Sequence, residues 1–109
     1  MEDCIFCKIV NGDFNTKFVY ENEHAVVFND INPKADTHLL VVPRKHVASL
    51  NEVEDAEFIG NLMMTAKETC KKIGLKSYKT MINTGAEAGQ TVFHLHIHIL
   101  GGEIKSFDL

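Results

Sequence analysis

Three histidines alternate with apolar residues in the segment His94-Leu95-His96-Ile97-His98-Ile99-Leu100. On a β-strand, alternate side chains point to the same face, so the three imidazoles share one face while Leu95, Ile97 and Ile99 point into the core. A merely solvated face would carry Thr, Lys or Glu, whereas imidazole is the side chain that changes charge near neutral pH. The spacing therefore indicates chemistry performed by histidine.

Three kinds of chemistry fit this strand. The first is one metal ion held by all three imidazoles, but the outer pair of a regular strand is about 13 Å apart. A Zn–N bond of about 2.1 Å joins the outer pair only if the strand bends sharply, so we disfavour a three-histidine zinc hydrolase. The second is a proton relay, whose further partners the pattern does not supply. The third divides the work: one histidine attacks as a nucleophile and a neighbour stabilises phosphate oxygens.

The loop before the strand favours this third alternative. It runs Asn83-Thr84-Gly85-Ala86-Glu87-Ala88-Gly89-Gln90-Thr91 and is rich in small residues. Glycine lets the backbone approach a ligand closely, and exposed N–H groups in such a loop bind anions. Gln90 and Thr91 add neutral hydrogen-bond donors next to the histidines. We interpret the loop as a phosphate-binding segment.

Composition sets the broad class. The 109 residues include 15 acidic and 11 basic side chains, a formal charge of −4. This balance argues against a nucleic-acid polymer as partner, since phosphates favour a basic surface, but it permits a single nucleotide. No apolar run approaches the roughly 18 residues of a membrane span, and the first residues lack the pattern of a signal peptide. We expect one domain, residues 1–109, in the cytoplasm and without a membrane partner.

The pattern of apolar residues predicts an α+β fold. Strands are expected over 18–21, 25–29, 37–42, 79–83 and 93–100, with a short helix over 5–10. A long helix is expected from a cap at Asn51 and Glu54 to Gly74. Its predicted buried face consists of Ile59, Leu62, Met63, Ala66, Cys70 and Ile73. Together these elements predict a five-stranded, mostly antiparallel sheet with one face covered by the long helix.

Several segments together resemble a known family. The histidine strand matches the signature of the histidine triad (HIT) family, in which three histidines alternate with apolar residues. The likeness extends through Phe28-Asn29-Asp30-Ile31-Asn32-Pro33, Thr37-His38-Leu39-Leu40-Val41-Val42-Pro43-Arg44-Lys45-His46, the loop 83–91 and Gly101-Gly102. It covers nearly the whole chain and is closest to the Hint-like branch, the nucleoside phosphoramidate hydrolases.

The resemblance implies roles for the histidines and their neighbours. His96 would attack the α-phosphorus of a purine nucleotide and form a nucleotidyl-histidine intermediate. His98 and Thr91 would contact the phosphate and the leaving group, and His38 would support the catalytic imidazole.

The resemblance also implies a nucleotide pocket. Asp30 would bind the two ribose hydroxyls, because a carboxylate accepts two hydrogen bonds well. Asn83, Gly89 and Gln90 would flank the phosphate. The slot for the base would be formed by apolar residues that the sequence on its own does not distinguish from core: Phe6, Ile9, Phe28, Ile31 and Leu40.

Cys4 and Cys7 form a C-x₂-C pair, which requires two further ligands to complete a tetrahedral zinc site. In bacterial relatives the histidine of the Pro-x-Lys-His segment and the first triad histidine supply them, which here are His46 and His94. The resemblance thus implies a structural zinc and no catalytic metal. The alternative is a pair of reduced core thiols, which is also our interpretation of Cys70.

Other functions remain open at this stage. They are a dinucleoside polyphosphate hydrolase, a nucleotide-binding regulator without catalysis, and a metal-dependent hydrolase. The resemblance further implies a two-fold homodimer through the long helix and the fourth strand, for which Met63, Met64 and the segment 79–83 are candidates. The C-terminal segment 101–109 is short and contains no Trp, whereas relatives often carry an aromatic tail.

Overall fold

One antiparallel sheet forms the centre of the molecule. The computed structural model of the chain describes residues 3–104. In order along the chain, the elements are α1 (Ile5–Val10), β1 (Tyr20–Glu21), β2 (Ala25–Asn29), β3 (Ala35–Pro43), α2 (Ala56–Ile73), β4 (Tyr78–Met81) and β5 (Ile97–Ile104). Short 3₁₀ turns cover Leu50–Glu52 and Ala86–Ala88. The five strands lie in the order β1-β2-β3-β5-β4, and each neighbouring pair is antiparallel, which confirms the predicted fold class.

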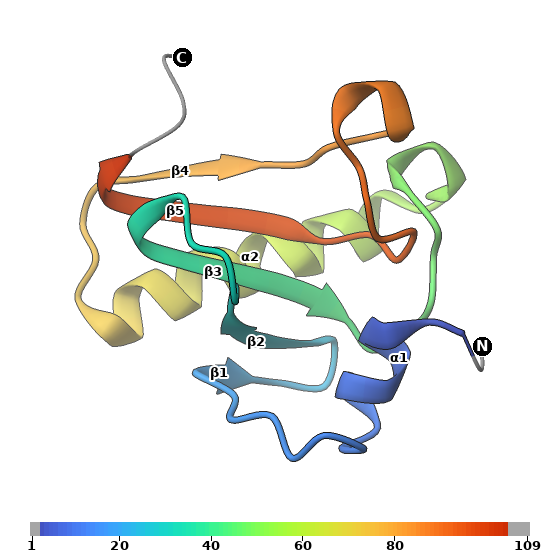
Figure 1. Cartoon of the computed structure of the whole chain (residues 1–109), viewed down its shortest axis with the longest axis horizontal. Helices are drawn as coiled ribbons and strands as arrows, with labels where there is room; N and C mark the ends of the chain where they lie inside the picture. Colours follow the sequence, from blue (N-terminus) through green and yellow to red (C-terminus); the bar gives the residue numbers. More distant parts are fainter. Residues whose placement is uncertain (1–2, 105–109) are drawn as a thin grey trace.

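The sheet buries both of its faces, but against different elements. In Figure 1, α2 crosses behind the sheet, while α1 lies near the C-terminal end of β3. Val27, Leu39 and Ile97 belong to a buried cluster that includes α2 residues, as the alternation along each strand requires. The intervening side chains form a second cluster, in which Phe6 of α1 joins the strand residues Val26, Phe28, Leu40 and Val42. The second face, where α1 lies, carries the histidines.

The buried face of α2 differs in part from the prediction. Leu62, Ala66 and Cys70 are buried as expected, but Met63 and Ile73 are each 41% exposed. Thr65 and Thr69 are fully buried in their place. Their hydroxyls donate hydrogen bonds to the carbonyl oxygens of residues 61 and 65 at 2.7 and 2.8 Å, so each buried polar group has a partner.

The predicted start of the long helix was wrong. Asn51 lies in the 3₁₀ turn, and α2 begins at Ala56, with its N-cap four residues later than predicted. Asp55 is the N-cap: its carboxylate accepts a hydrogen bond from the backbone N–H of Glu57 at 2.9 Å. The predicted end is confirmed, because Gly74 caps α2 with a left-handed φ of 75°.

The histidine strand also begins later than predicted, at Ile97 rather than Phe93. Before it, the N–H of Leu95 donates to the carbonyl oxygen of Val47 at 2.7 Å, outside the sheet ladder. The side chain of His94 is also bound outside the sheet ladder, since its Nε2 donates a hydrogen bond to the carbonyl oxygen of Pro43. The alternation nevertheless persists through this irregular stretch, since Leu95, Ile97 and Ile99 all lie in the core cluster beneath α2.

Among residues 3–104, no helix is long and apolar enough to span a membrane. Most of the C-terminal segment considered above, residues 105–109, lies outside the described residues, as do residues 1 and 2.

Candidate active site

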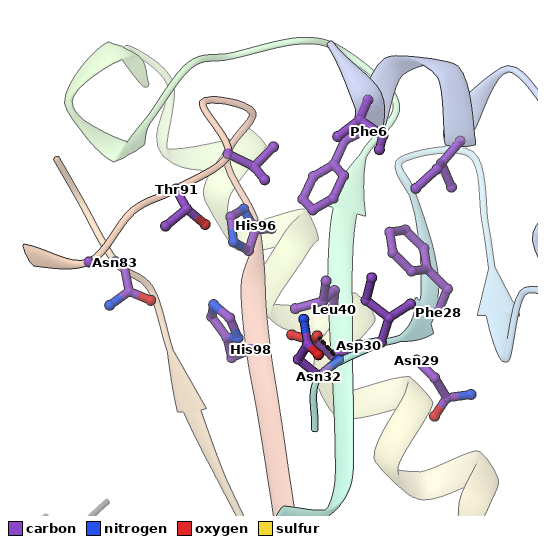
Figure 2. A pocket seen from close by; sticks show the side chains of 15 residues that line it. Phe6, Phe28, Asn29, Asp30, Asn32, Leu40, Asn83, Thr91, His96 and His98 are labelled. Atoms are coloured by element: carbon purple, nitrogen blue, oxygen red, sulfur yellow. Dashed lines mark hydrogen bonds between the residues drawn. The ribbon is translucent and has the colours of Figure 1, made fainter. Parts of the chain in front are cut away.

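A cavity of about 320 Å³ opens on the sheet face that carries α1. It receives side chains from α1, the end of β2, β3, the loop after β4 and the histidine segment (Figure 2). The lining residues are Ile5, Phe6, Ile9, Phe28, Asn29, Asp30, Ile31, Asn32, Leu40, Asn83, Gly89, Thr91, Val92, His96 and His98. The fold therefore brings together eleven of the site residues predicted from the sequence, His96 among them.

One end of the cavity is aromatic and aliphatic. The ring of Phe6 meets the ring of Phe28 edge-on, with centroids 5.7 Å apart, and meets the ring of His96 at 5.1 Å. In Figure 2, Phe6, Phe28 and Leu40 lie on one side of the two histidines, and Asn83 and Thr91 lie on the other. The cavity thus has an apolar end and a polar end with His96 between them.

The imidazole of His96 is held in one tautomer. Its Nδ1 lies 2.8 Å from the carbonyl oxygen of His94, and because a carbonyl only accepts, Nδ1 carries the proton. Nε2 is then unprotonated in the neutral ring. Burial lowers the pKa of His96, although the bond to the carbonyl of His94 opposes this effect. The result is a neutral imidazole whose lone pair lies on Nε2.

His98 is oriented by a chain of hydrogen bonds through His38. The backbone N–H of Lys34 donates to Nδ1 of His38 at 3.0 Å, which leaves the proton of His38 on Nε2. That Nε2 lies 2.8 Å from Nδ1 of His98 and 3.4 Å from a carboxylate oxygen of Asp30. Nδ1 of His98 therefore accepts, and its Nε2 carries a proton. Burial, reinforced by the neighbouring His96 and His38, lowers the pKa of His98 to about 4.

Asp30 stands at the turn that joins β2 to β3. One of its carboxylate oxygens accepts the backbone N–H of Asn32 at 2.8 Å, which is drawn as a dashed line in Figure 2. Its own N–H donates to the carbonyl of His38 at 2.9 Å. These bonds fix the carboxylate at the rim of the cavity, close to the histidine pair.

Two predicted site residues lie elsewhere. Gln90 is 3% exposed and lines neither this cavity nor its neighbour, because its amide holds the loop together. Its Nε2 donates to the carbonyls of Ala48 and Val92, and its Oε1 accepts the N–H of Gly85. His38 lies beneath His98 and lines an adjoining cavity instead.

The cavity also contains residues that the sequence analysis missed: Ile5, Asn29, Asn32 and Val92. A signal existed for Ile5, which precedes Ile9 by one helical turn and so shares its face of α1. Asn29 and Asn32 flank Asp30 at the turn, and their identity offered no such signal.

Beside the cavity, Cys4, Cys7, His46 and His94 form a compact cluster whose ligand atoms all lie within 4.8 Å of one another. Sγ of Cys4 lies 3.3 Å from Nδ1 of His94, and Sγ of Cys7 lies 3.3 Å from Nδ1 of His46. The two Nδ1 atoms are 3.1 Å apart. Tetrahedral zinc with these ligands separates donor atoms by about 3.4–3.8 Å, so the cluster has the size of such a site.

The hydrogen bonding of His94 also fits a metal ligand. Its Nε2 donates to the carbonyl oxygen of Pro43 at 2.8 Å, which leaves the lone pair on Nδ1 directed at the cysteines. Burial, together with the neighbouring Cys4, raises the pKa of the Cys7 thiol. A divalent cation would favour the thiolates that this environment otherwise disfavours. The four residues could therefore hold a metal ion.

Comparison with known proteins identifies the family. The HIT domain family matches residues 11–104. The chain belongs to the HIT family. Among curated HIT relatives, Protein HitA of Neisseria gonorrhoeae is 46% identical over 104 residues, covering 93% of this chain and 97% of that protein.

Solved HIT structures share the fold across almost the whole chain. A histidine triad protein from Clostridium difficile superposes with a TM-score of 0.90 at 39% identity, covering 94% of this chain and 93% of that one. A HIT family hydrolase from Legionella pneumophila gives a TM-score of 0.89 at 37% identity, with coverages of 97% and 98%. A zinc-bound histidine triad family protein from Mycobacterium smegmatis gives 0.83 at 29% identity, with coverages of 94% and 76%.

Proposed function

We propose that the protein hydrolyses purine nucleoside 5′-phosphoramidates through a covalent nucleotidyl intermediate on His96. The observation that carries this proposal is the fixed tautomer of His96, whose unprotonated Nε2 belongs to a ring that lines a cavity with an apolar slot at one end. A hydrolase activity also agrees with the name of the Legionella relative.

In this proposal the base of the nucleotide lies at the apolar end of the cavity and its phosphate lies at the polar end. The purine lies in the apolar slot with Phe6, Phe28 and Leu40 around it, and Ile9 and Ile31 complete its lining. Asp30 accepts the two ribose hydroxyls at the rim. The α-phosphate then reaches the polar end, where His98, Asn83 and Thr91 lie and Gly89 lets the loop approach.

The substrate nitrogen first takes up a proton from solvent. Nε2 of His96 then forms a bond to phosphorus as the P–N bond breaks, and the nitrogen leaves as a neutral amine. Nδ1 of His96 keeps its proton, and the carbonyl oxygen of His94 stabilises the positive charge that the ring acquires. His98 donates its Nε2 proton as a hydrogen bond to a phosphate oxygen. Burial keeps His98 neutral and the chain through His38 keeps its proton on Nε2, so we assign His98 stabilisation of charge rather than proton transfer.

In the second step, water attacks the phosphorus, the Nε2–P bond breaks to restore His96, and one proton of the water returns to solvent. Over the whole reaction one water is consumed: the leaving nitrogen gains one proton, and the hydroxyl of the water ends on the phosphorus. The products are an amine and a nucleoside monophosphate.

For the cluster of Cys4, Cys7, His46 and His94 we propose zinc. Two thiolates and two imidazoles are the donors of structural zinc sites, and the Mycobacterium relative is described as zinc-bound. When bound there, the ion would supply a crosslink between α1 and the segment before β5, and no chemistry of the reaction. The cluster uses His94 and leaves His96 and His98 for the substrate.

We also propose a two-fold homodimer. Met63 and Met64 are 41% and 51% exposed on α2, and β4 lies at an edge of the sheet. An exposed edge and exposed methionines are commonly covered by a second copy. Sedimentation velocity should give twice the mass of one chain and a Met64→Lys variant should shift toward monomer; a monomer at all concentrations refutes the dimer.

The function is tested by incubating wild-type protein and His96→Ala with adenosine 5′-phosphoramidate. We expect release of AMP by the wild type and a loss of about 10³-fold or more in the variant. Tight binding of AMP without turnover would instead support a nucleotide-binding regulator. Faster cleavage of a dinucleoside polyphosphate would support that second hydrolase, and activity abolished by chelation at unchanged folding would support a metal-dependent one.

A further inference from the structure

A second cavity, of about 360 Å³, adjoins the first at the polar end. Its lining shares Asp30, Asn32, Asn83, Gly89, Thr91 and His98 with the first cavity. It gains His38, Lys34 and Met81, and it lacks His96 together with the apolar slot.

The register of the sheet explains why His98 belongs to both cavities. On β5, His98 lies opposite Leu40 of β3 on one side and opposite Met81 of β4 on the other. Leu40 lines the first cavity and Met81 lines the second. The ring of His98 therefore stands at the junction, where the proposed mechanism places the phosphate.

The direction of attack determines the side of the phosphate from which the leaving group departs. In a displacement at phosphorus, the attacking and leaving atoms lie roughly in line on opposite sides. His96 lines the first cavity and not the second. A group that leaves from a phosphate at His98, on the side away from His96, thus departs toward the second cavity.

The second cavity differs from the first in charge. Within residues 3–104, Asp30 is the formally charged side chain that lines both cavities, and Lys34 is the one that lines the second alone. The side chain of Lys34 is exposed and makes no ion pair with another described residue. Burial is the main cause that lowers the pKa of His38; the positive charge of Lys34 adds to this effect and Asp30 opposes it.

We propose that the second cavity receives the leaving group and that Lys34 makes it selective for leaving groups that carry an anion, such as the carboxylate of an amino acid joined to phosphorus through its nitrogen. This inference rests on the proposed phosphoramidate hydrolysis. The substrate nitrogen takes up a proton from solvent, the Nε2–P bond forms as the P–N bond breaks, and the amino acid departs with its carboxylate intact. The water that then attacks the phosphorus returns a proton to solvent.

The experiment uses two matched substrates, AMP joined through phosphorus to the nitrogen of alanine and AMP joined in the same way to alaninamide. They differ in one charge and hardly in size. We measure kcat/KM for each with wild type, Lys34→Gln, Lys34→Arg and Lys34→Glu. The matched control is Lys67→Gln, because Lys67 is also an exposed lysine but lies on α2, across the sheet from the cavity.

The ratio of the two kcat/KM values, acid over amide, should fall about 5-fold in Lys34→Gln, as loss of one partly screened ion pair implies. It should fall further in Lys34→Glu and stay near the wild-type value in Lys34→Arg and Lys67→Gln. High salt should reduce the wild-type ratio toward that of Lys34→Gln.

Other outcomes separate this inference from the proposed function. Cleavage of both substrates with a ratio that Lys34→Gln leaves unchanged overturns the role of Lys34 while the hydrolysis stands. A third result is an unchanged ratio together with a fall, in Lys34→Gln, of kcat/KM for ADP relative to that for adenosine 5′-phosphoramidate. It would overturn selectivity for a carboxylate and show that Lys34 favours a phosphate leaving group instead. Failure of the wild type to cleave any of these compounds overturns the proposed function itself.

Discussion

Nδ1 of His96 donates a hydrogen bond of 2.8 Å to the carbonyl oxygen of His94. The ring of the same His94 points its Nδ1 at Cys4 and Cys7, at 3.3 and 3.5 Å. One residue therefore orients the proposed nucleophile through its backbone and takes part in the metal-binding cluster through its side chain. A disturbance of the cluster should be transmitted to His96.

The first prediction concerns loss of the metal. Cys7→Ser should bind less than one metal ion per chain and should melt about 10 °C lower, equivalent to about 2 kcal/mol in a domain of this size. Its kcat for adenosine 5′-phosphoramidate should fall about 10-fold, because a small displacement of an attacking group is costly. Metal analysis, thermal unfolding and the kinetic assay measure the three effects.

Cys70→Ala is the control for the loss of a thiol. Cys70 lies on the buried face of α2 and belongs to the core cluster away from the metal-binding residues. This variant should keep its metal and its kcat even if removal of the buried sulfur lowers the melting temperature. Unchanged metal content and melting temperature in Cys7→Ser would show that the cluster holds no metal.

The second prediction concerns stability in acid. Because burial and the neighbouring His96 and His38 lower the pKa of His98 from its ordinary 6.5 to about 4, the unfolded chain binds a proton at this residue before the folded chain does. The free energy of unfolding should therefore fall as the pH drops from 6.5 toward 4. At pH 5 the contribution of His98 to this loss is about 1–2 kcal/mol, with partial exposure of the ring taken into account.

Denaturant unfolding at pH 7.5 and pH 5 measures this loss, with His98→Asn as the comparison. The Asn side chain offers an oxygen to the Nε2 proton of His38 but does not titrate. Protonation of the metal ligands affects both proteins equally, so the difference between their pH dependences isolates His98. Equal losses of stability in the two proteins would contradict the neutral state that we assign to His98.

The alternation of buried residues could be predicted from the sequence because it depends on local geometry. Leu95, Ile97 and Ile99 all lie in the core cluster, as predicted from their alternation with the histidines, and α1 spans the predicted residues 5–10. Strand ends were less predictable, since the start of β5 depends on distant groups. The carbonyls of Val47 and Pro43, which engage Leu95 and His94, are such groups.

Polar residues in buried positions escaped prediction for a related reason. Thr65 and Thr69 count as polar in a hydrophobic pattern, yet a helical threonine satisfies its hydroxyl with the carbonyl one turn before it and can then be buried. For Gln90, the residue type indicated a hydrogen-bond donor but not its partner. The fold directs the amide to the backbone of residues 48, 85 and 92.

The third prediction concerns Asp30 and the ribose. Asp30→Asn should raise KM for adenosine 5′-phosphoramidate about 10-fold, because a hydrogen bond to a charged group is worth about 1.5–3 kcal/mol. The increase should be much smaller for the 2′-deoxy substrate, which lacks one of the two hydroxyls. The amide oxygen of Asn can still accept the N–H of Asn32, so the turn should persist.

Glu57→Gln is the matched control, since it removes an exposed carboxylate from the first turn of α2. It should leave KM unchanged for both substrates. An equal change in KM for the ribo and deoxyribo substrates in Asp30→Asn would mean that Asp30 does not bind the 2′-hydroxyl.

The fourth prediction concerns the backbone of the loop that approaches the phosphate. Gly89 has a φ of +95°, and a Cβ added there would lie 3.2 Å from Nδ2 of Asn83. That Nδ2 donates to the carbonyl of Ala88 at 2.8 Å, so the added methyl group would strain the loop and press on a residue that lines the cavity. Gly89→Ala should lose about 1–2 kcal/mol of stability and about 10-fold in kcat/KM.

Gly74→Ala separates the two effects, because Gly74 has a φ of +75° at the end of α2 with no atom within 4 Å of an added Cβ. It should lose similar stability and keep its kcat/KM; if Gly89→Ala also keeps its kcat/KM, the loop does not position the phosphate.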